Sequence, residues 1–427
     1  MTARWVLAIA YLRTRLLRRW LTSRIRIERW QTRRLAQLMR DATQQVAFYR
    51  GFRDSAFSEL PIVGKREVMA RFEDFNRLGL TAAQVWSMID RGEAPKGYDV
   101  GCSTGTSGNQ GLYLVSDQER FVWLGTIVAK AIPLSLLRQH RVAIVLPRSS
   151  RLYDAANESK LLQLRFVDLR LGLQAAAEAL TAFRPTAIVG PPKALRWFAE
   201  NDIAMSPRTI FSSAEVLDPP DRDVIERRFG VTLRQIYMAT EGLFGVSCEH
   251  GTLHLAEDVV HFEFEQVSGS PDLVAPVVTD FTRRTQIMAR YRMNDILRLD
   301  SRRCPCGSAL QAVAEVIGRR DDMFLLPNCD PALPNVLVTP DLLRNAVLAA
   351  DRNIDDFRIR QTDENRIDIV LPLHVSGSAG EAVRTAVLRA CAQLEAQPVV
   401  DVKHEALQPR TDAKLRRVEN CWRPGAP

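Results

Sequence analysis

A short stretch near the end of the first quarter of the chain is dense in glycines and hydroxyls. Residues 103–111 read Ser-Thr-Gly-Thr-Ser-Gly-Asn-Gln-Gly, which gives three glycines and four hydroxyl side chains. Glycines let a backbone turn tightly and present N–H groups to an anion, and hydroxyls add donors for phosphate oxygens. The stretch matches neither a Walker loop nor a dinucleotide-binding Gly-x-Gly-x-x-Gly. It predicts a phosphate-binding loop, and the alternative is a hydroxyl-rich surface loop.

A second set of residues has the chemistry of a metal site. Cys248, His254, Cys304 and Cys306 offer three thiols and one imidazole, which is a complete tetrahedral ligand set for zinc. The Cys-x-Cys spacing is tighter than the common Cys-x2-Cys, and His250 is a replacement ligand. Such a zinc would join two loops and do no chemistry itself. The alternative is a group of reduced core thiols beside an unrelated histidine.

The middle of the chain alternates apolar runs with helical patterns. Strands are expected at residues 142–146, 186–190, 209–213, 233–237 and 260–264, and helices at 171–183, from about 193, and at 221–229. This alternation predicts an α/β core around a largely parallel sheet. Apolar residues at 46% and charged residues at 25% are typical of globular proteins and exclude a disordered or collagen-like chain.

The last hundred residues have a different pattern. A hairpin is expected from residues 357–361 and 366–371, followed by a helix at 379–396 and a strand near 399–402. This is a compact α+β module of its own. We therefore expect a helical arm over residues 1–55, a core domain over 56–318 and a small domain over 319–427.

The positive charge of the chain is concentrated in the N-terminal arm. The net charge is +8, but the first 40 residues hold 11 arginines and a single acid, Glu28, so they carry +10 and the rest about −2. A basic surface over the whole fold is therefore excluded, and no nucleic-acid partner is expected. Leucines and tryptophans at near-helical spacing between the arginines predict a basic amphipathic helix. It either packs on its own domain or lies on an anionic membrane surface.

The start of the chain contains no pattern for secretion or for crossing a bilayer. The apolar run at residues 5–12 is too short to span a membrane, and arginines follow it without a small-residue cleavage site. Seven sparse cysteines fit a reducing compartment. We expect a cytoplasmic protein, with peripheral contact at the inner face of a membrane as an open alternative.

Five further stretches follow the glycine–hydroxyl loop in a fixed order. They are Ser-Ser-Ala-Glu at 212–215, Tyr-Met-Ala-Thr-Glu-Gly at 237–242, Ala-Arg-Tyr-Arg-Met-Asn-Asp-Ile at 289–296, Gly-Arg-Arg-Asp-Asp-Met at 318–323 and Pro-Arg-Thr-Asp-Ala-Lys-Leu-Arg-Arg-Val at 409–418. With the loop, these stretches resemble the motifs of the adenylate-forming superfamily of acyl- and aryl-CoA synthetases. The resemblance is strongest to its phenylacetate–CoA ligase-like branch and spans about residues 58–418.

The resemblance implies a fold and a reaction. The fold is α/β, with a large N-terminal adenylate-forming domain and a small, mobile α+β C-terminal domain. Enzymes of this family join a carboxylate to the α-phosphate of ATP, release pyrophosphate, and pass the acyl group from AMP to a thiol of CoA or of a carrier protein's phosphopantetheine. Two anions must meet in the first step, so positioning and positive charge are the main demands.

The resemblance also implies roles for individual residues. The β- and γ-phosphates would lie on Ser103, Thr104, Gly105, Thr106, Ser107 and Gly108. The nucleotide would contact Ser213, Ala214, Glu215, Tyr237, Asp295, Arg319 and Asp321, with Asp295 on the ribose and Asp321 as the hinge. Thr240 would contact the α-phosphate, Glu241 would hold Mg²⁺, and Lys414 would place its ammonium beside the reacting groups. Without the ordered family motifs, Glu241 would be interpreted as a surface acid, Asp295 as a turn residue and Lys414 as a lysine of the C-terminal tail.

The chain departs from the family pattern at several positions. The loop ends Asn109-Gln110-Gly111 where a lysine is frequent, so one phosphate contact is missing or comes from an arginine. Ala413 replaces a glycine, Met238 stands near the acyl pocket, and residues 325–331 replace a glycine-rich turn near the thiol tunnel. Lys65 and Lys193 are expected to be solvated. These departures leave room for a partly degenerate catalyst.

The expected function is activation of a small carboxylic acid. The branch implies an aromatic acid, and Phe211, Tyr237 and Phe244 are either acyl-pocket residues or ordinary core. One alternative is nucleotidyl transfer that stops at an adenylated product. Another is a non-catalytic, membrane-surface partner protein that retains the fold.

Overall fold

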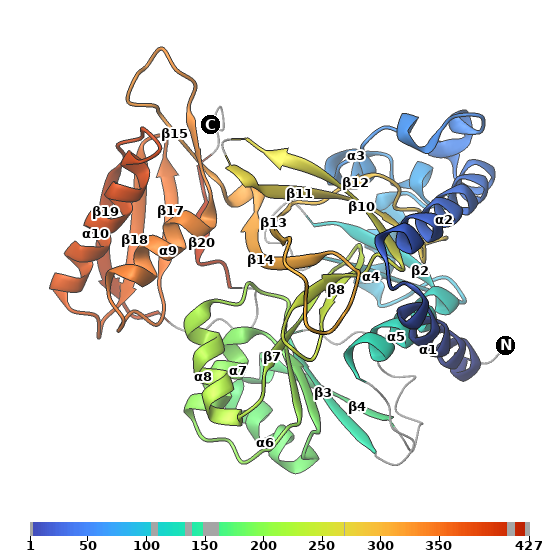
Figure 1. Cartoon of the computed structure of the whole chain (residues 1–427), viewed down its shortest axis with the longest axis horizontal. Coiled ribbons are helices and arrows are strands. Elements are labelled where there is room, and N and C mark those ends of the chain that lie inside the picture. Colours follow the sequence, from blue (N-terminus) through green and yellow to red (C-terminus); the bar gives the residue numbers. More distant parts are fainter. Residues whose placement is uncertain are drawn as a thin grey trace.

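The structure, a computed structural model, describes residues 3–103, 110–132, 139–147, 162–268, 270–407 and 415–422. It is a mixed α/β protein, as expected, in which a large sheet is covered by helices and a smaller α+β part follows at the C-terminal end (Figure 1). Among the described residues, no helix combines the length and apolar character needed to cross a bilayer.

The N-terminal arm is two helices rather than one. α1 (Ala3–Trp20) ends before Ser23, whose side chain accepts a hydrogen bond from the backbone N–H of Arg26 and so caps α2 (Arg24–Gln45). Short elements lead on to the sheet: η1 (Ala47–Phe52), η2 (Phe57–Glu59), α3 (Lys65–Ala70), η3 (Phe72–Phe75) and α4 (Ala82–Arg91). A hairpin of β1 (Tyr98–Cys102) and β2 (Leu112–Ser116) brackets the glycine–hydroxyl stretch.

In the described part of the chain, twelve strands form the main sheet. They are β3 (His140–Leu146), β4 (Leu162–Asp168), β5 (Ala187–Gly190), β6 (Thr209–Ser213), β7 (Leu233–Ala239), β8 (Gly242–Ser247), β9 (Leu253–Leu255), β10 (Val260–Val267), β11 (Ser270–Asp280), β12 (Tyr291–Arg292), β13 (Asp295–Asp300) and β14 (Ala312–Arg319). The order is β10-β11-β13-β14-β9-β8-β7-β6-β5-β3-β4, with β12 beside β11. The strands are parallel from β4 to β7 and antiparallel from β7 to β10.

The expectation of a largely parallel sheet is therefore right for one half only. Helical crossovers join β4 to β5, β5 to β6 and β6 to β7, whereas β7 and β8 are joined by a two-residue turn. A connection that short permits only antiparallel pairing.

Helices cover both faces of the parallel half. Side chains alternate along β3, so Ala143 and Val145 pack with α6 (Leu173–Phe183), α7 (Pro192–Glu200) and α8 (Pro219–Phe229), and η5 (Leu169–Leu171) precedes them. Val142 and Ile144 pack on the opposite face against α5 (Asp117–Ala131). α1 lies on the outer side of α5 (Figure 1).

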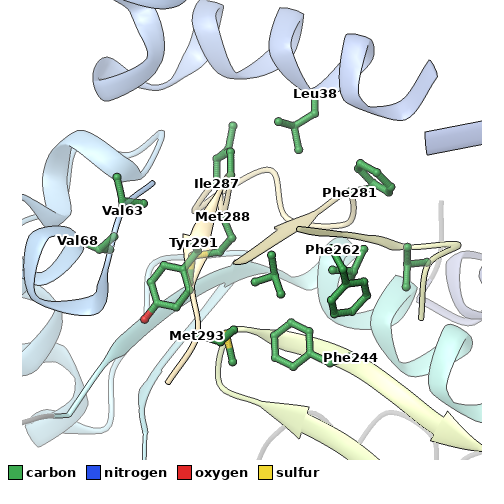
Figure 2. Close-up of a cluster of buried hydrophobic side chains, with 14 of the residues drawn as sticks. Leu38, Val63, Val68, Phe244, Phe262, Phe281, Ile287, Met288, Tyr291 and Met293 are labelled. Carbon is green, nitrogen blue, oxygen red and sulfur yellow. The ribbon is translucent and has the colours of Figure 1, made fainter. Parts of the chain in front are cut away.

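The antiparallel half has an apolar core of its own under α2. Leu38 of α2 belongs to the same buried cluster as Phe262 and Phe281 of this half of the molecule (Figure 2). Tyr291 buries its ring at the edge of the same cluster, and its hydroxyl points away from the labelled apolar side chains (Figure 2). Packing of the Tyr291 ring in this core therefore directs its hydroxyl away from the apolar cluster.

The C-terminal module, residues 324–422, has a separate buried core. Its elements are β15 (Phe324–Leu326), β16 (Val336–Val338), α9 (Pro340–Ala350), β17 (Arg358–Asp363), β18 (Arg366–Pro372), α10 (Gly377–Ala392), β19 (Val399–Glu405) and β20 (Val418–Asn420), preceded by η6 (Arg320–Asp322). A four-stranded sheet runs β19-β18-β17-β20. The expected hairpin and helix are present, although the helix ends at Ala392 instead of residue 396. The domain limits at residues 55 and 318 stay predictions.

Candidate nucleotide and acid site

The Thr-Glu motif forms the turn between β7 and β8. Thr240 and Glu241 are its two central residues, because Ala239 pairs with Gly242 across the ladder. A Cβ at Gly242 would lie 2.7 Å from Oδ2 of the buried Asp280, so only glycine fits there. A guanidinium nitrogen of Arg283 donates to the carbonyl oxygen of Thr240 at 2.5 Å. The turn is held from both sides.

Two predicted nucleotide residues bond to each other on neighbouring strands. The Tyr237 hydroxyl donates to Oδ2 of Asp295 at 2.8 Å. Burial, and then the nearby Asp295 carboxylate, raise the pKa of Tyr237 well above its ordinary value. Asp295 on β13 is directly opposite Arg319 on β14. All three residues line a cavity of about 190 Å³, so the structure brings this predicted group together.

The end of β6 carries the next predicted group. Ser213 closes the strand, and Ala214 has φ +73°, a left-handed conformation that is strained for a residue with a Cβ. Oε1 of Glu215 accepts a hydrogen bond from the backbone N–H of Leu415 at 2.8 Å. Lys414, the residue before Leu415, lies outside the described residues. The bond joins the tip of a sheet strand to the C-terminal segment.

A larger cavity of about 730 Å³ adjoins the smaller one. Tyr113, Val115, Trp123, Leu146 and Thr240 are among the residues that line it. Both cavities are lined by Lys193, Ala214, Glu215, Met238, Ala239 and Leu415. Because they share this wall, a polar ligand in the smaller cavity and an apolar one in the larger cavity would meet at the end of β6 and β7.

Two of the proposed acyl-pocket residues lie elsewhere. Phe211 and Phe244 are fully buried in hydrophobic clusters and line neither cavity, so they are core. Tyr237 lines the smaller cavity. The aromatic walls of the larger cavity instead include Tyr113 of β2, Trp123 of α5 and Trp197 of α7.

The glycine–hydroxyl stretch is described only at its base. Ser103 N–H donates to the Gly111 carbonyl at 2.7 Å, and Gly111 N–H donates to Ser103 Oγ at 2.9 Å. Thr104, Gly105, Thr106, Ser107 and Gly108 lie outside the described residues. Cys102, just before the stretch, lines the larger cavity, so the base of the stretch is at the site.

Lys65, expected to be solvated, lies beside this base. A Cβ on Gly111 would be 3.0 Å from Lys65 Cε and 3.7 Å from its Nζ. Burial lowers the pKa of Lys65, and the nearby Glu241 carboxylate partly offsets this. Arg319 and Asp321 are its other charged neighbours. Sequence reasoning missed this residue, and the only signal for it was the lack of a lysine at residues 109–111.

Glu241 and Asp321 have partners that hold their carboxylates. The Tyr291 hydroxyl donates to Glu241 Oε1 at 3.2 Å, and burial followed by this carboxylate raises the pKa of Tyr291. The Asn294 amide donates to Asp321 Oδ2 at 2.8 Å and accepts from its N–H at 3.2 Å. Asp321 lines neither cavity, which is compatible with a hinge position beside the site.

Arginines on the larger cavity were also missed from the sequence. Arg283 lines it, and among the described atoms its buried Nη1 has no hydrogen-bond partner. Arg120 lines the same cavity and pairs with Asp99 at 3.7 Å and Asp117 at 3.3 Å. A buried guanidinium without a complete set of acceptors favours an anionic ligand.

The cysteine and histidine set is brought together. Among the described residues, the four ligand atoms of Cys248, His254, Cys304 and Cys306 lie within 4.8 Å of one another. Cys248 and Cys304 Sγ are 3.6 Å apart, and Cys306 Sγ is 3.3 Å from His254 Nε2. Zinc bond lengths imply roughly 3.5–3.8 Å between tetrahedral ligand atoms, so the set fits zinc. The exposed His250 is not in the cluster.

His254 is oriented for this role by its second nitrogen. Nδ1 is 3.2 Å from the Leu310 carbonyl, which can only accept, so Nδ1 carries the hydrogen and Nε2 is left as the ligand atom. The adjacent Leu253 lines the smaller cavity. The cluster therefore braces β9 next to the site.

The comparisons with known proteins identify the fold. No family model matches the sequence. Among curated proteins, Protein CapK of Staphylococcus aureus is 25% identical over 201 residues, which cover 45% of this chain and 43% of that protein. The chain thus spans less than half the length of this relative.

Similarity to solved structures is more extensive. A 2-hydroxyisobutyryl-CoA ligase in the post-adenylation state, in complex with R3-HIB-AMP, superposes with a TM-score of 0.70 at 16% identity, over 94% of this chain and 91% of that one. An amide bond synthetase from Marinactinospora thermotolerans superposes with a TM-score of 0.53 at 16% identity, over 75% and 68%. The chain has the fold of an adenylate-forming ligase. The phenylacetate–CoA ligase-like branch stays a prediction.

The same 2-hydroxyisobutyryl-CoA ligase in an open conformation superposes with a TM-score of 0.59 at 18% identity, over 90% of this chain and 89% of that one.

Proposed function

We propose that this chain is an ATP-dependent acid–thiol ligase. A carboxylate oxygen attacks the α-phosphorus of ATP, the bond to the β-phosphate oxygen breaks, and acyl-AMP and pyrophosphate result. The thiol sulfur of CoA, or of a carrier protein's phosphopantetheine, then replaces AMP at the acyl carbon. The observation that carries this proposal is the pair of adjoining cavities that share a wall at Ala214, Glu215 and Met238.

The smaller cavity suits the adenosine part of the nucleotide. Asp295 and Arg319 offer an acceptor and a cation on neighbouring strands, as ribose hydroxyls and a phosphate require. Thr240 lies at the boundary with the larger cavity, where the α-phosphate would be. Ala214, Glu215 and Tyr237 complete the wall of the nucleotide side, whereas Ser213 lines the larger cavity.

The charge demanded by the reaction has several sources. We assign to Lys65 the phosphate contact that the loop itself lacks, since its ammonium lies at the base of that loop. Glu241 would hold Mg²⁺, for which a carboxylate is a suitable ligand. Lys414 would place an ammonium beside the reacting carboxylate, as the family pattern implies.

The larger cavity supports an apolar, aromatic acid. Tyr113, Trp123, Val115 and Leu146 supply apolar walls, and Arg283 supplies a cation at the end near Thr240. An aromatic acid with its carboxylate toward Thr240 satisfies both features.

Exchange of radiolabelled pyrophosphate into ATP tests the proposal. The full chain, with Mg²⁺, is incubated with separate aromatic and short aliphatic acids. We expect exchange that depends on the acid and is fastest with an aromatic one. Lys414→Ala should slow it by on the order of 10²–10³, as for lost transition-state donors.

The other outcomes separate the alternatives. Pyrophosphate release without consumption of CoA or a carrier thiol would support nucleotidyl transfer. Absence of ATP binding by calorimetry would favour a partner protein that retains the fold, and would overturn the ligase proposal.

We also propose a structural zinc at Cys248, His254, Cys304 and Cys306. The ion would tie the loop after β8 to the loop after β13, and so hold β9 against the smaller cavity. Elemental analysis of the purified chain should find about one zinc per chain, and Cys306→Ser should lose it and lower the thermal midpoint. Cys391→Ser, at a buried cysteine outside the cluster, should keep the metal. A zinc content far below one per chain in the unmutated protein contradicts the assignment.

A further inference from the structure

Helix α1 is docked to the body of the molecule by one face. Val6, Ala10 and Thr14 are buried, at the four-residue spacing of a single helix face. They pack toward α5, where a Cβ on Gly125 would lie 2.8 Å from the Cβ of Ala10. The helix axes therefore approach closely, and α1 is a fixed part of the surface.

A second face of α1, turned away from the buried row, exposes large apolar side chains. They are Trp5, Ile9, Leu12, Leu16 and Trp20, with exposed fractions of 65%, 49%, 58%, 64% and 41%. Spacings of four, three, four and four residues place all five on one stripe of the helix. We refer to these five residues as the α1 stripe. An exposed apolar row of this length on a globular protein marks an interaction surface.

The flanks of the α1 stripe are cationic. Arg13 borders it on one side and Arg19 on the other, given 100° per residue, and both are exposed. α1 contains no acidic residue, and the first 40 residues carry +10. The α1 stripe thus pairs an apolar centre with cationic edges, which is the pattern of a helix lying in a membrane interface.

We propose that α1 docks the protein on an anionic lipid bilayer, with the α1 stripe among the acyl chains near the headgroups and the arginines at the phosphates. The positive charge of α1 favours an anionic bilayer over a second copy of the chain. A second copy of the chain laid along the same stripe would bring two sets of arginines together, which is unfavourable. An anionic bilayer meets both the apolar row and the positive edges.

The test uses vesicle flotation with the full chain. One set of vesicles is phosphatidylcholine alone, and the other contains phosphatidylglycerol as well. We expect flotation with the anionic vesicles, little with the neutral ones, and a decrease as salt rises. The double variant Leu12→Ser/Leu16→Ser should reduce binding at least tenfold, because two exposed apolar anchors are lost.

A matched control changes exposed leucines elsewhere. Leu171→Ser/Leu333→Ser removes two leucines that are 73% and 49% exposed, far from α1 in sequence, and should bind vesicles like the unmutated chain. Flotation does not depend on catalysis, so a failure of the ligase proposal would not alter the vesicle-binding result. Under the ligase proposal, both double variants should keep the pyrophosphate exchange rate of the unmutated chain. The inference is overturned if the unmutated chain does not float with anionic vesicles. It is also overturned if both double variants bind equally, or if the α1 variant only abolishes self-association.

Discussion

At the scale of single residues, Lys65 lies beside the base of the glycine–hydroxyl loop although it belongs to none of the sequence motifs. It begins α3, and a short backbone pairing of Val63 with Tyr291 fixes its place in the sheet. Tyr291 in turn bonds to Glu241. The lysine, the base of the loop and the Thr-Glu turn are thereby linked through one strand.

Substitution of Lys65 tests its assigned phosphate contact. Lys65→Ala should slow acid-dependent pyrophosphate exchange by on the order of 10², because a preorganised cation at developing negative charge is lost. Lys96→Ala, at an exposed lysine, is the control and should retain full exchange. Equal rates for the two variants would remove the role of Lys65.

Glu119 is a residue whose ionisation contributes to stability. Burial alone would raise its pKa, but hydrogen bonds from the Arg284 backbone, Ser116 and Thr285 outweigh burial and lower the pKa from 4.5. A lowered pKa means that the folded state holds fewer protons than the unfolded state. The stabilisation is complete above pH 4.5 and is lost as the pH falls through the lower, folded-state pKa.

The pH dependence of a Glu119→Gln variant should follow from this. At pH 7 we expect a loss of about 2 kcal/mol, since hydrogen bonds to a charged acceptor are replaced. The difference in unfolding free energy between the variant and the unmutated chain should become smaller as the pH drops below about 4.5. Thermal midpoints across pH measure it, with the exposed Glu178→Gln as reference. A gap that stays constant with pH would contradict the assignment.

The residues of the site differ in how visible they are in the sequence. Tyr237, Asp295 and Arg319 are found because their motifs keep a fixed order, and the structure brings them to one cavity. Lys65 and Arg283 lack such a motif. They reach the site only through folding, so their spacing in the sequence contains no signal.

At the scale of elements, the contact of α1 with α5 depends on Gly125. A side chain at this position would meet the backbone of α1 at Leu7 and Tyr11. Neither neighbour is the flexible end of a side chain, so the helices would have to separate. The glycine is required for close approach between helices and not for a turn.

A larger residue at this crossing should be destabilising. Gly125→Val should lower stability by about 1–3 kcal/mol, the range for overpacking a tight contact, and should lower the thermal midpoint. Gly377→Ala, where a Cβ meets open space, is the matched control and should change little. An unaltered midpoint in Gly125→Val would mean that α1 is not tightly packed.

Elements with strong local signals were predictable and the others were not. β6 occupies the expected residues 209–213, and α8 begins two residues before the expected 221. The arm over residues 1–55 was expected to be helical, with no break predicted within it. The Ser23 side chain instead caps a new helix, α2, by accepting a hydrogen bond from the Arg26 N–H. Whether a serine caps a helix depends on local backbone geometry, which the apolar pattern of the sequence does not contain.

At the scale of the whole molecule, an ionic cluster joins the C-terminal module to the helices of the large sheet. Arg417 contacts Asp218, and it contacts Asp221 and Asp356 at 3.2 Å each. Lys193 contacts Asp356 at 3.0 Å. Lys193 was expected to be solvated, and the structure places it in this cluster instead. Such charges are stable only while they remain paired.

Removal of the central cation should loosen the module. Arg417→Ala removes the cation that three carboxylates share, although each of them keeps another cation nearby. It should destabilise the docked arrangement by about 1.5–3 kcal/mol, the range for lost hydrogen bonds to charged groups. Small-angle scattering should show a larger radius of gyration, and trypsin should cut between the two parts sooner. Arg360→Ala, at a half-exposed arginine 3.8 Å from Glu419, is the control. Identical scattering from both variants would show that the cluster does not hold the module.

The hydrogen bond between Glu215 and Leu415 has a consequence for timing. It lies on the wall that both cavities share, so a swing of the C-terminal module that breaks this bond would uncover both chambers together. Under the proposed reaction, nucleotide departure and entry of the second reactant would then belong to a single opening event. Bulk water would gain access in the same instant, so the fraction of activated acid lost to hydrolysis would be set by how quickly a thiol arrives after each opening.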